Sequence, residues 1–193
     1  MPVPLRLKVD SSDNWALTVL QNFDLFLTDH AANERKASAM AISLAVHYPD
    51  RMELVGRMVD LAVEELNHYR QVMRIMLDKG IVQKADEKDP YVNRLLGAAN
   101  KASEAYFLDR LLIAAVVEAR GAERFELLSR QLTDADMRQF YTALAQSESR
   151  HYALFLELAT TYFEEALVID RLEEWLSIEK DIVVSLPLTG KLH

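Results

Sequence analysis

The sequence predicts an all-α protein, a four-helix bundle with additional N-terminal and C-terminal helices. Half of its 193 residues are hydrophobic, whereas glycine and proline number only five each, and this scarcity of helix breakers favours long helices. Apolar residues recur at helical spacing along most of the chain, and no run of alternating apolar and polar residues is long enough to suggest a sheet. A nine-residue pattern typical of a bundle interior also occurs twice.

The N-terminal part is expected to contain a lead-in and two helices. Residues 1–13 are predicted to be extended, and polar side chains just before Asn14 offer N-caps for a helix that begins there. Apolar residues keep helical spacing through Ala31, which predicts a short helix followed by a second helix that contains Glu34. The sequence leaves the junction between these two helices open.

The rest of the chain is predicted to form four longer helices. Gly80 suits a helix C-terminus, Thr133 suits an N-cap, and Pro187 ends the last helix. Residues 80–100, which include Pro90, are expected to be a polar connector. We treat residues 1–193 as a single domain with core helices over about 28–163, and the four helices run over about 51–79, 101–130, 133–163 and 164–186.

Composition excludes several classes of site. The chain has no cysteine, so disulfides, zinc–thiolate sites, iron–sulfur clusters and thiol nucleophiles are all excluded. The N-terminus lacks the apolar core of a signal peptide, and no apolar run reaches the roughly 18 residues that a membrane span needs. A cytoplasmic protein with no membrane partner is therefore expected. The net charge of −8 means that any contact with RNA needs a local basic patch.

The duplicated pattern is Leu-Ala-x-x-Glu-x-x-His-Tyr, at residues 61–69 and again 83 positions later at residues 144–152. Each copy places a carboxylate and an imidazole one turn apart on one helix face. A lone glutamate precedes the glutamate of the first copy by 31 residues and that of the second by 30. Four glutamates and two histidines in this arrangement are the ligand set of a carboxylate-bridged dinuclear metal site in a four-helix bundle. The predicted ligands are Glu34, Glu65, His68, Glu118, Glu148 and His151.

The predicted turns agree with this ligand set. In an antiparallel helical hairpin, residues equidistant from the turn face each other. The midpoint of Glu34 and Glu65 falls at the helix break after Tyr48, and the midpoint of the second glutamate pair falls at Thr133. Both pairs therefore lie about 15 residues, or roughly 23 Å, from their turns. The two hairpins are expected to hold their ligands at matched depth.

Alternatives exist for the individual ligands. Most glutamates are solvated surface residues, but a lone charge at Glu118, directly after seven apolar residues, needs a partner or a metal. The assignment of Glu34 as a ligand is less secure because polar residues flank it. His30 could support Glu34 from one turn away, although a surface histidine is the favoured interpretation. Glu64 could replace Glu65, but the second copy has a serine at that position. The alternative to the whole ligand set is an internally duplicated helical bundle that binds no metal.

The ligand types indicate which metal is expected. Oxygen-rich sites with one imidazole per ion suit iron or manganese, whereas zinc prefers more nitrogen or sulfur ligands. Small residues beside both lone glutamates leave room for O₂. Two iron ions with O₂ as co-substrate are therefore the first expectation and manganese the second. No glycine-rich dinucleotide motif is present, and no catalytic residue is predicted beyond the metal ligands.

The ligand pattern resembles the ferritin-like di-iron superfamily. The flanking residues resemble more closely the tRNA 2-methylthio-N6-isopentenyladenosine hydroxylases, over about residues 13–163. Gly121-Ala122 is a departure, since Ser-Cys is expected in that family. The strings that carry the resemblance are DHAANERKA at 29–37, YPDRMELV at 48–55, EELNH at 64–68, EARGAERF at 118–125 and SESRH at 147–151.

The resemblance implies a non-haem di-iron monooxygenase that hydroxylates the isopentenyl group of a hypermodified adenosine in tRNA. It also implies a separate electron-donor protein, because the chain has no flavin or nicotinamide motif and no cysteine for a cluster. The alternatives are a ferritin-type iron oxidase and storage protein, or a peroxide-reducing di-iron protein. The candidate RNA contact is the connector, for which a solvated loop is the equal alternative. Its basic residues are Lys79, Lys84, Lys88, Arg94 and Lys101.

Overall fold

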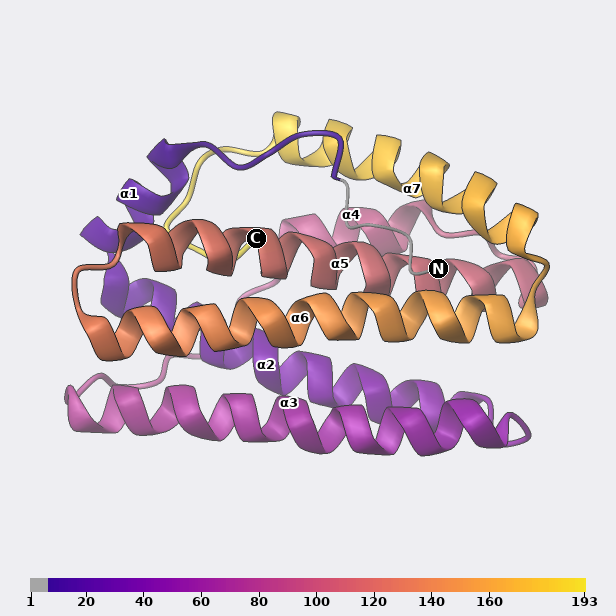
Figure 1. Ribbon diagram of the computed structural model, residues 1–193, viewed down its shortest axis with the longest axis horizontal. Helices are drawn as coiled ribbons and strands as arrows, with labels where there is room; N and C mark the ends of the chain where they lie inside the picture. The colour runs from indigo at the N-terminus through magenta and orange to yellow at the C-terminus, as the bar shows by residue number, and fades with distance from the viewer. Residues whose placement is uncertain (1–6) are drawn as a thin grey trace. The chain divides into compact units, whose positions relative to one another are not determined.

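The structure is a computed structural model that describes residues 7–193, and all regular secondary structure in that range is helical. The all-α prediction is therefore confirmed. The predicted extended lead-in lies partly outside the described residues, and residues 7–12 form no helix. The helices, shown in Figure 1, are α1 (Asp13–Gln21), α2 (Phe23–His47), α3 (Met52–Asp78), α4 (Pro90–Ala98), α5 (Ser103–Gln131), α6 (Ala135–Tyr162) and α7 (Glu165–Ser185).

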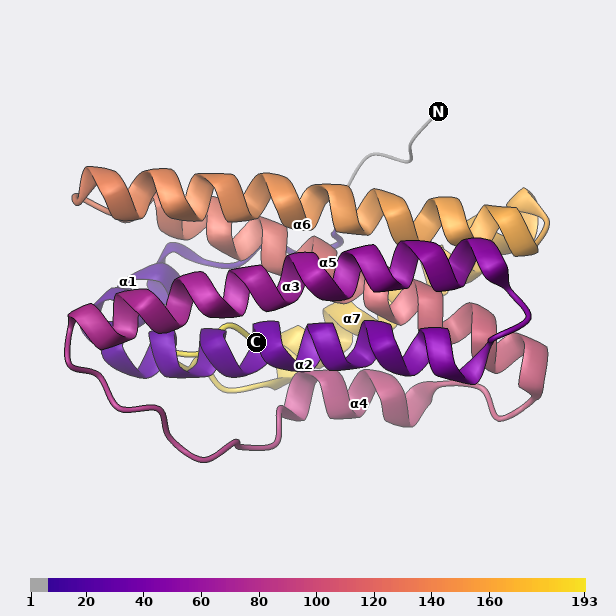
Figure 2. The ribbon, with the colours of Figure 1, turned by 90° about the horizontal axis from the view of Figure 1, so that it is seen from below.

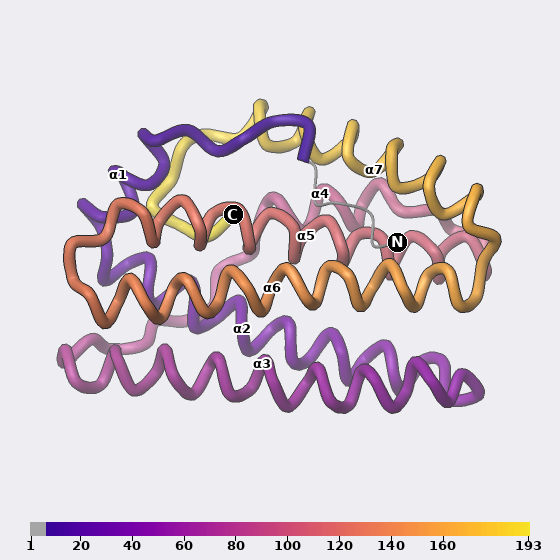
Figure 3. Tube along the Cα trace, viewed as in Figure 1, coloured from indigo at the N-terminus to yellow at the C-terminus, as the bar shows by residue number. Residues whose placement is uncertain are grey.

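The helices belong to two compact units, one formed mainly by residues 19–87 and the other mainly by residues 88–189. In the first unit α2 packs along α3, and Figure 2 shows the two helices side by side in opposite directions. In the second unit α5 packs along α6, α7 contacts both of these helices, and α4 contacts α5 and α7. The trace in Figure 3 passes from α5 into α6 through a short turn. Each unit therefore contains one of the two predicted hairpins.

The ends of the α2–α3 hairpin follow from local chemistry. The helix is interrupted between α1 and α2 at Asn22, whose N–H donates to Val19 O at 3.0 Å. Asn22 is therefore the junction that the sequence left open. Gly80 follows α3 with φ of +69°, a left-handed conformation that glycine adopts without a Cβ clash. The N–H of Ile81 then donates to Met76 O at 2.8 Å and closes the last turn.

The start of α6 differs from the prediction by one residue. Asp134, rather than Thr133, is the N-cap, because its carboxylate accepts the backbone N–H groups of Asp136 at 2.9 Å and Met137 at 3.0 Å. An aspartate at this position also interacts favourably with the positive end of the helix dipole. The hairpin turn itself lies where the glutamate spacing placed it.

The connector prediction was wrong for residues 90–98, which form α4. Pro90 begins this helix rather than breaking it, since the first turn needs no backbone donor there. The carboxylate of Asp89 caps the helix by accepting the N–H groups of Tyr91 at 2.8 Å and Val92 at 3.2 Å. Tyr91 and Leu95, one turn apart, are buried and hold the helix against the rest of its unit.

Helix α7 is confirmed, and it begins and ends within one residue of the predicted range. Leu172, Trp175 and Leu176 are buried, whereas Leu167 is exposed. The helix also carries a buried acid, Glu179, which the sequence did not single out.

Glu179 forms an ion pair with Arg120 of α5, with Nε 2.8 Å from Oε1 and both side chains fully buried. The hydroxyl of Tyr91 donates to the same carboxylate at 3.2 Å, which ties α4 into this network. Burial, together with the negative charge of Glu179, raises the pKa of Tyr91 well above its usual value.

Among residues 7–193, no helix has the length and apolar character needed to cross a membrane.

Candidate metal centre

The α2–α3 hairpin brings together three predicted ligands, the first triad, which consists of Glu34, Glu65 and His68. All three side chains are buried, with at most 7% of any residue exposed. Nδ1 of His68 lies 3.2 Å from Glu65 Oε2 and 3.6 Å from Glu34 Oε2. Each residue offers a ligand atom, and these atoms lie within 4.8 Å of one another. The hairpin alone can thus present two carboxylates and one imidazole to a cation.

His30 joins the first triad from the preceding turn of α2. Its Nε2 atom lies 2.6 Å from Glu34 Oε1, and its side chain is fully buried. The interpretation of His30 as a surface histidine was therefore wrong. The helical spacing pointed to the contact, but the flanking polar residues concealed that this face of α2 is turned inward. The hydrogen bond fixes one oxygen of Glu34 and leaves the other directed toward His68.

The electrostatics of the first triad favour a bound cation. Burial by itself disfavours a charged imidazole at His68, but hydrogen bonds and charge from Glu34 and Glu65 outweigh it and raise the pKa of His68 to about 10. The two carboxylates thus create a strongly negative buried environment that binds a proton tightly. A metal ion supplies the same positive charge and can replace that proton.

The α5–α6 hairpin brings together the second triad, which consists of Glu118, Glu148 and His151. These side chains are also buried, and their ligand atoms likewise lie within 4.8 Å of one another. Nδ1 of His151 lies 3.6 Å from both Glu118 Oε2 and Glu148 Oε2. The duplicated sequence pattern therefore corresponds to a duplicated arrangement of side chains, one in each unit.

The surroundings of the second triad differ from those of the first. Ala114 occupies the position on α5 that His30 occupies on α2, four residues before the lone glutamate. Gly121, where the family is expected to have serine, lies beside Glu148, and an added Cβ would meet Glu148 Cγ at 3.7 Å, an ordinary contact distance. This departure from the family pattern therefore leaves the carboxylate undisturbed. Glu118 also has no histidine one turn before it, unlike Glu34.

The donor set of the two triads suits iron. Each triad has two carboxylates and one imidazole, the oxygen-rich combination found in non-haem iron sites rather than in zinc sites. Glu65 is fully buried within its triad, whereas Glu64 is only half-buried, which favours Glu65 as the ligand. The residues present therefore fit the metal that the sequence analysis expected.

The connector presents basic and acidic side chains to solvent. Lys84 is exposed, as is Lys88 at the start of the neighbouring unit. Arg35, next to Glu34 on α2, forms an ion pair with Asp86, and the Lys36 ammonium donates to the backbone O of Glu87 at 3.1 Å. Asp86 thus pairs with Arg35, and a backbone carbonyl of the connector holds Lys36, while Lys84 and Lys88 are exposed.

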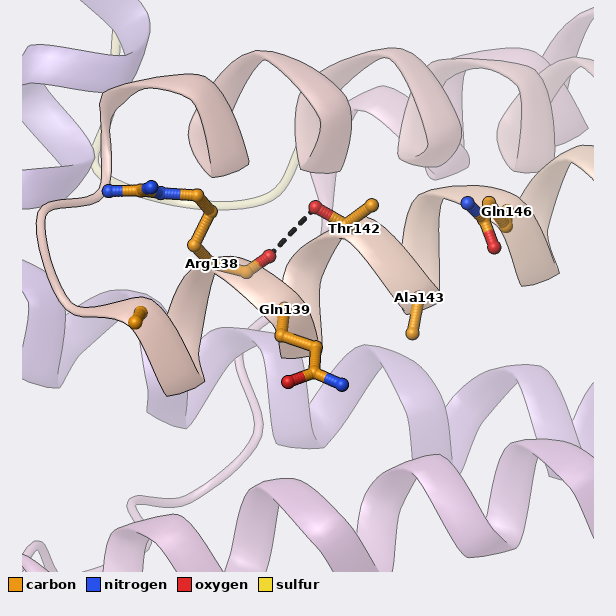
Figure 4. A pocket seen from close by; sticks show the side chains of 6 residues that line it. Arg138, Gln139, Thr142, Ala143 and Gln146 are labelled. Atoms are coloured by element: carbon orange, nitrogen blue, oxygen red, sulfur yellow. Dashed lines mark hydrogen bonds between the residues drawn. The ribbon is translucent and has the colours of Figure 1, made fainter.

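A shallow hollow on the outer face of α6 is unrelated to either triad. Figure 4 shows its side chains along one helix, where the hydroxyl of Thr142 donates to the Arg138 backbone O at 2.8 Å. None of its lining residues is a carboxylate or a histidine, so it offers no metal ligands of the expected type. They are Ala135, Arg138, Gln139, Thr142, Ala143 and Gln146.

Comparisons with known proteins agree in family and fold. The family model described as tRNA-(ms2io6A)-hydroxylase (MiaE) matches residues 2–193. A tRNA 2-(methylsulfanyl)-N(6)-isopentenyladenosine(37) hydroxylase from Pseudomonas putida is 33% identical over 173 residues, which cover 90% of this chain and 84% of the relative. The enzyme of the same name from Salmonella typhimurium is 34% identical over 141 residues, which cover 73% of this chain and 52% of the relative.

A solved structure has the same fold. A Synechococcus protein described as having aldehyde deformylating oxygenase activity matches with a TM-score of 0.91 and 28% identity. The match covers 97% of this chain and 94% of that one. The ferritin-like fold predicted from the ligand pattern is thereby confirmed, with α1 as the additional N-terminal helix and α7 as the additional C-terminal helix.

Proposed function

The chain belongs to the tRNA-(ms2io6A)-hydroxylase family, and from this premise we propose that it hydroxylates the isopentenyl group of 2-methylthio-N6-isopentenyladenosine in tRNA. The observation that carries the proposal is the pair of buried triads, each with two carboxylates and one imidazole, in a chain whose relatives are named hydroxylases of this nucleoside. The reaction inserts one atom of O₂ into a C–H bond. The other atom leaves as water and consumes two electrons and two protons.

We propose that the two triads together bind two iron ions within a single domain, with manganese as the weaker candidate. The duplicated pattern and the matched depth of both triads in their hairpins support this assignment. When bound, the two ions would supply the reductive activation of O₂ that a carbon hydroxylation requires. The six ligands are Glu34, Glu65, His68, Glu118, Glu148 and His151.

The chain's own residues have three tasks in this reaction. The ligands hold positive charge in a buried environment, as the raised pKa of His68 indicates. His30 orients Glu34 through the contact at Nε2. Burial of both triads keeps bulk water from the reacting groups and protects them from side reactions.

We propose that a separate protein supplies the electrons. The chain contains no cysteine for an iron–sulfur cluster, and its sequence has no glycine-rich dinucleotide motif. The expected reductant is a one-electron or two-electron carrier in the same compartment, which supplies the two electrons that the reaction consumes. A cytoplasmic location, where tRNA is modified, agrees with this requirement.

Two other activities are alternatives to this proposal. Ferritin-type iron oxidation would use the triads without an organic substrate, and aldehyde deformylation is the activity named for the Synechococcus structure. Family membership favours hydroxylation of tRNA over both alternatives.

A bacterial strain that makes the unhydroxylated nucleoside should acquire the hydroxylated nucleoside when it expresses this chain, as measured by mass spectrometry of digested tRNA. Expression of Glu118→Ala should leave the nucleoside unhydroxylated. Iron oxidation or aldehyde turnover by the purified chain, with unchanged tRNA, would contradict the proposal.

A further inference from the structure

Helix α3 carries a second apolar face in addition to the one that holds the first triad. The side chains of this outer face are between 46% and 74% exposed. Single exposed apolar residues are common on protein surfaces, but these five lie along one helix. We call them the α3 seam: Met52, Val59, Val63, Leu66 and Leu77.

The seam has the period of a coiled coil. Gly56, Arg70 and Met73 lie between the five seam residues on the same face, and with them the positions are separated by alternating steps of four and three residues. The mean spacing of about 3.5 residues is the repeat by which two helices pair in a coiled coil. Gly56 and Arg70 are exposed, and Met73 is half-buried. From Met52 to Leu77 the seam is roughly 38 Å long.

The seam is complementary to itself in the antiparallel direction. If two α3 helices pair with a twofold axis at the midpoint of Val63 and Leu66, Val63 of one copy faces Leu66 of the other. Gly56 then faces Met73, and an added Cβ at Gly56 would meet no atom of the same chain within 4 Å, so the space there is open to a large side chain. The ends of the seam match as well, since Met52 faces Leu77 in both copies.

The charges that flank the seam have the same symmetry. Glu53 and Asp60 lie beside its first half. In the second half Arg70 occupies a seam position, where it faces Val59 of the other copy, and Arg74 lies beside the seam. Within residues 7–193, none of these four takes part in an ion pair. Antiparallel pairing places Glu53 of one copy beside Arg74 of the other and Asp60 beside Arg70, and the twofold axis repeats both pairs. Parallel pairing would instead place Arg70 opposite Arg70 and leave Glu53 and Asp60 without a basic partner on the other copy.

We propose that the α3 seam is the interface of a homodimer in which two copies pair α3 against α3 in antiparallel orientation. The partner is a second copy of this chain, because both the apolar seam and its flanking charges complement themselves. This proposal does not depend on the proposed function. Since α3 also carries Glu65 and His68, each copy would rigidify the helix that holds two ligands of the other copy's first triad.

The first test is the mass of the full chain in solution. Light scattering coupled to size-exclusion chromatography should give 44.2 kDa, twice the 22.1 kDa of one chain. The double variant Val63→Glu/Leu66→Glu should elute as a monomer with unchanged helical content, because both side chains are exposed. The matched control, Leu167→Glu/Val184→Glu on the exposed face of α7, should stay dimeric. A monomeric wild type, or a seam variant that remains a folded dimer, would overturn the proposal.

A charge swap tests the orientation. Glu53→Arg and Arg74→Glu should each weaken dimerisation about tenfold, because each places like charges together at two symmetry-related positions. The combined variant Glu53→Arg/Arg74→Glu restores opposite charges only in the antiparallel arrangement and should recover the wild-type dissociation constant. A combined variant weaker than either single variant would exclude antiparallel pairing of α3.

Discussion

The imidazole of His30 lies with Nε2 at 2.6 Å from Oε1 of Glu34, and both side chains are buried. This contact makes the two lone glutamates unequal although the sequence pattern around them is duplicated. The second hairpin has Ala114 at the corresponding position, so no histidine precedes Glu118 by one turn. The contact with His30 is therefore specific to the orientation of Glu34.

The first prediction follows from this inequality. His30→Leu should lower the iron affinity of the protein about 10-fold to 100-fold, the usual loss when a partner of a metal ligand is removed. His30→Gln, which retains an N–H donor, should lose less. A competition titration with a chelator measures the affinity, and His47→Leu at the exposed end of α2 is the matched control. Equal affinities in wild type and His30→Leu would show that the contact does not orient Glu34.

The second prediction concerns the ligands themselves. Glu118→Ala should abolish binding of two ions per chain, while the metal-free protein should unfold at the same or a higher temperature. The reason is that the substitution removes a buried charge, and burial of an ionised carboxylate is costly unless a bound cation compensates it. His151→Ala should also lose metal and keep its helical content. Elemental analysis and circular dichroism give the two readouts. Wild-type iron content in either variant would remove that residue from the ligand set.

The third prediction is a pH effect at the start of α4. Burial tends to raise the pKa of Asp89, but His193 and the N–H groups of Val92 and Tyr91 outweigh it and lower the pKa to about 2. A carboxylate with a lowered pKa in the folded protein stabilises it above the unfolded pKa of about 4, and this stabilisation is lost as the pH falls toward 2. The contribution is about 2 kcal/mol.

Urea unfolding between pH 5 and pH 2 tests this effect. The free energy of unfolding of the wild type should fall more steeply with decreasing pH than that of Asp89→Asn. Asparagine still caps the helix but carries no charge, so it isolates the ionised carboxylate. Parallel curves for the two proteins would mean that Asp89 has an ordinary pKa.

The fourth prediction concerns the RNA surface. Lys84→Glu/Lys88→Glu should weaken tRNA binding and leave the iron content unchanged, because both side chains are exposed and far in sequence from every predicted ligand. Wild-type affinity should fall with salt on a shallow slope set by about two to four neutralised phosphates, since the net charge of −8 opposes broader contact. Affinity measured at two salt concentrations gives both quantities. Unchanged binding by the variant would place the surface elsewhere, with Arg35, Lys36 and Arg51 as the next candidates.

Much of the hairpin geometry could be predicted because it depends on local periodicity. The spacing of Glu34 and Glu65 about their turn is a property of two regular helices, and so is the spacing of Glu118 and Glu148. Small shifts at the ends, such as the cap at Asp134, did not alter which residues face each other.

Other features depend on contacts between residues distant in sequence. Glu179 lies between an isoleucine and a lysine near the end of α7, where a solvated glutamate is usual, and its partner Arg120 is 59 residues away. Burial of His30 likewise depends on what packs against α2, not on its neighbours in the chain. The helix at Pro90 was missed for a different reason, since proline both breaks helices and begins them.

The most direct test of the central claim is the source of the oxygen atom in the product. Iron-loaded protein, a chemical reductant and tRNA that contains the unhydroxylated nucleoside are incubated under isotopically labelled O₂, and the digested nucleosides are analysed by mass spectrometry. We predict a hydroxylated isopentenyl group that carries one labelled oxygen atom, and no product with Glu118→Ala. Absence of hydroxylated nucleoside with fully iron-loaded wild type, or an oxygen atom derived from water, would contradict the account.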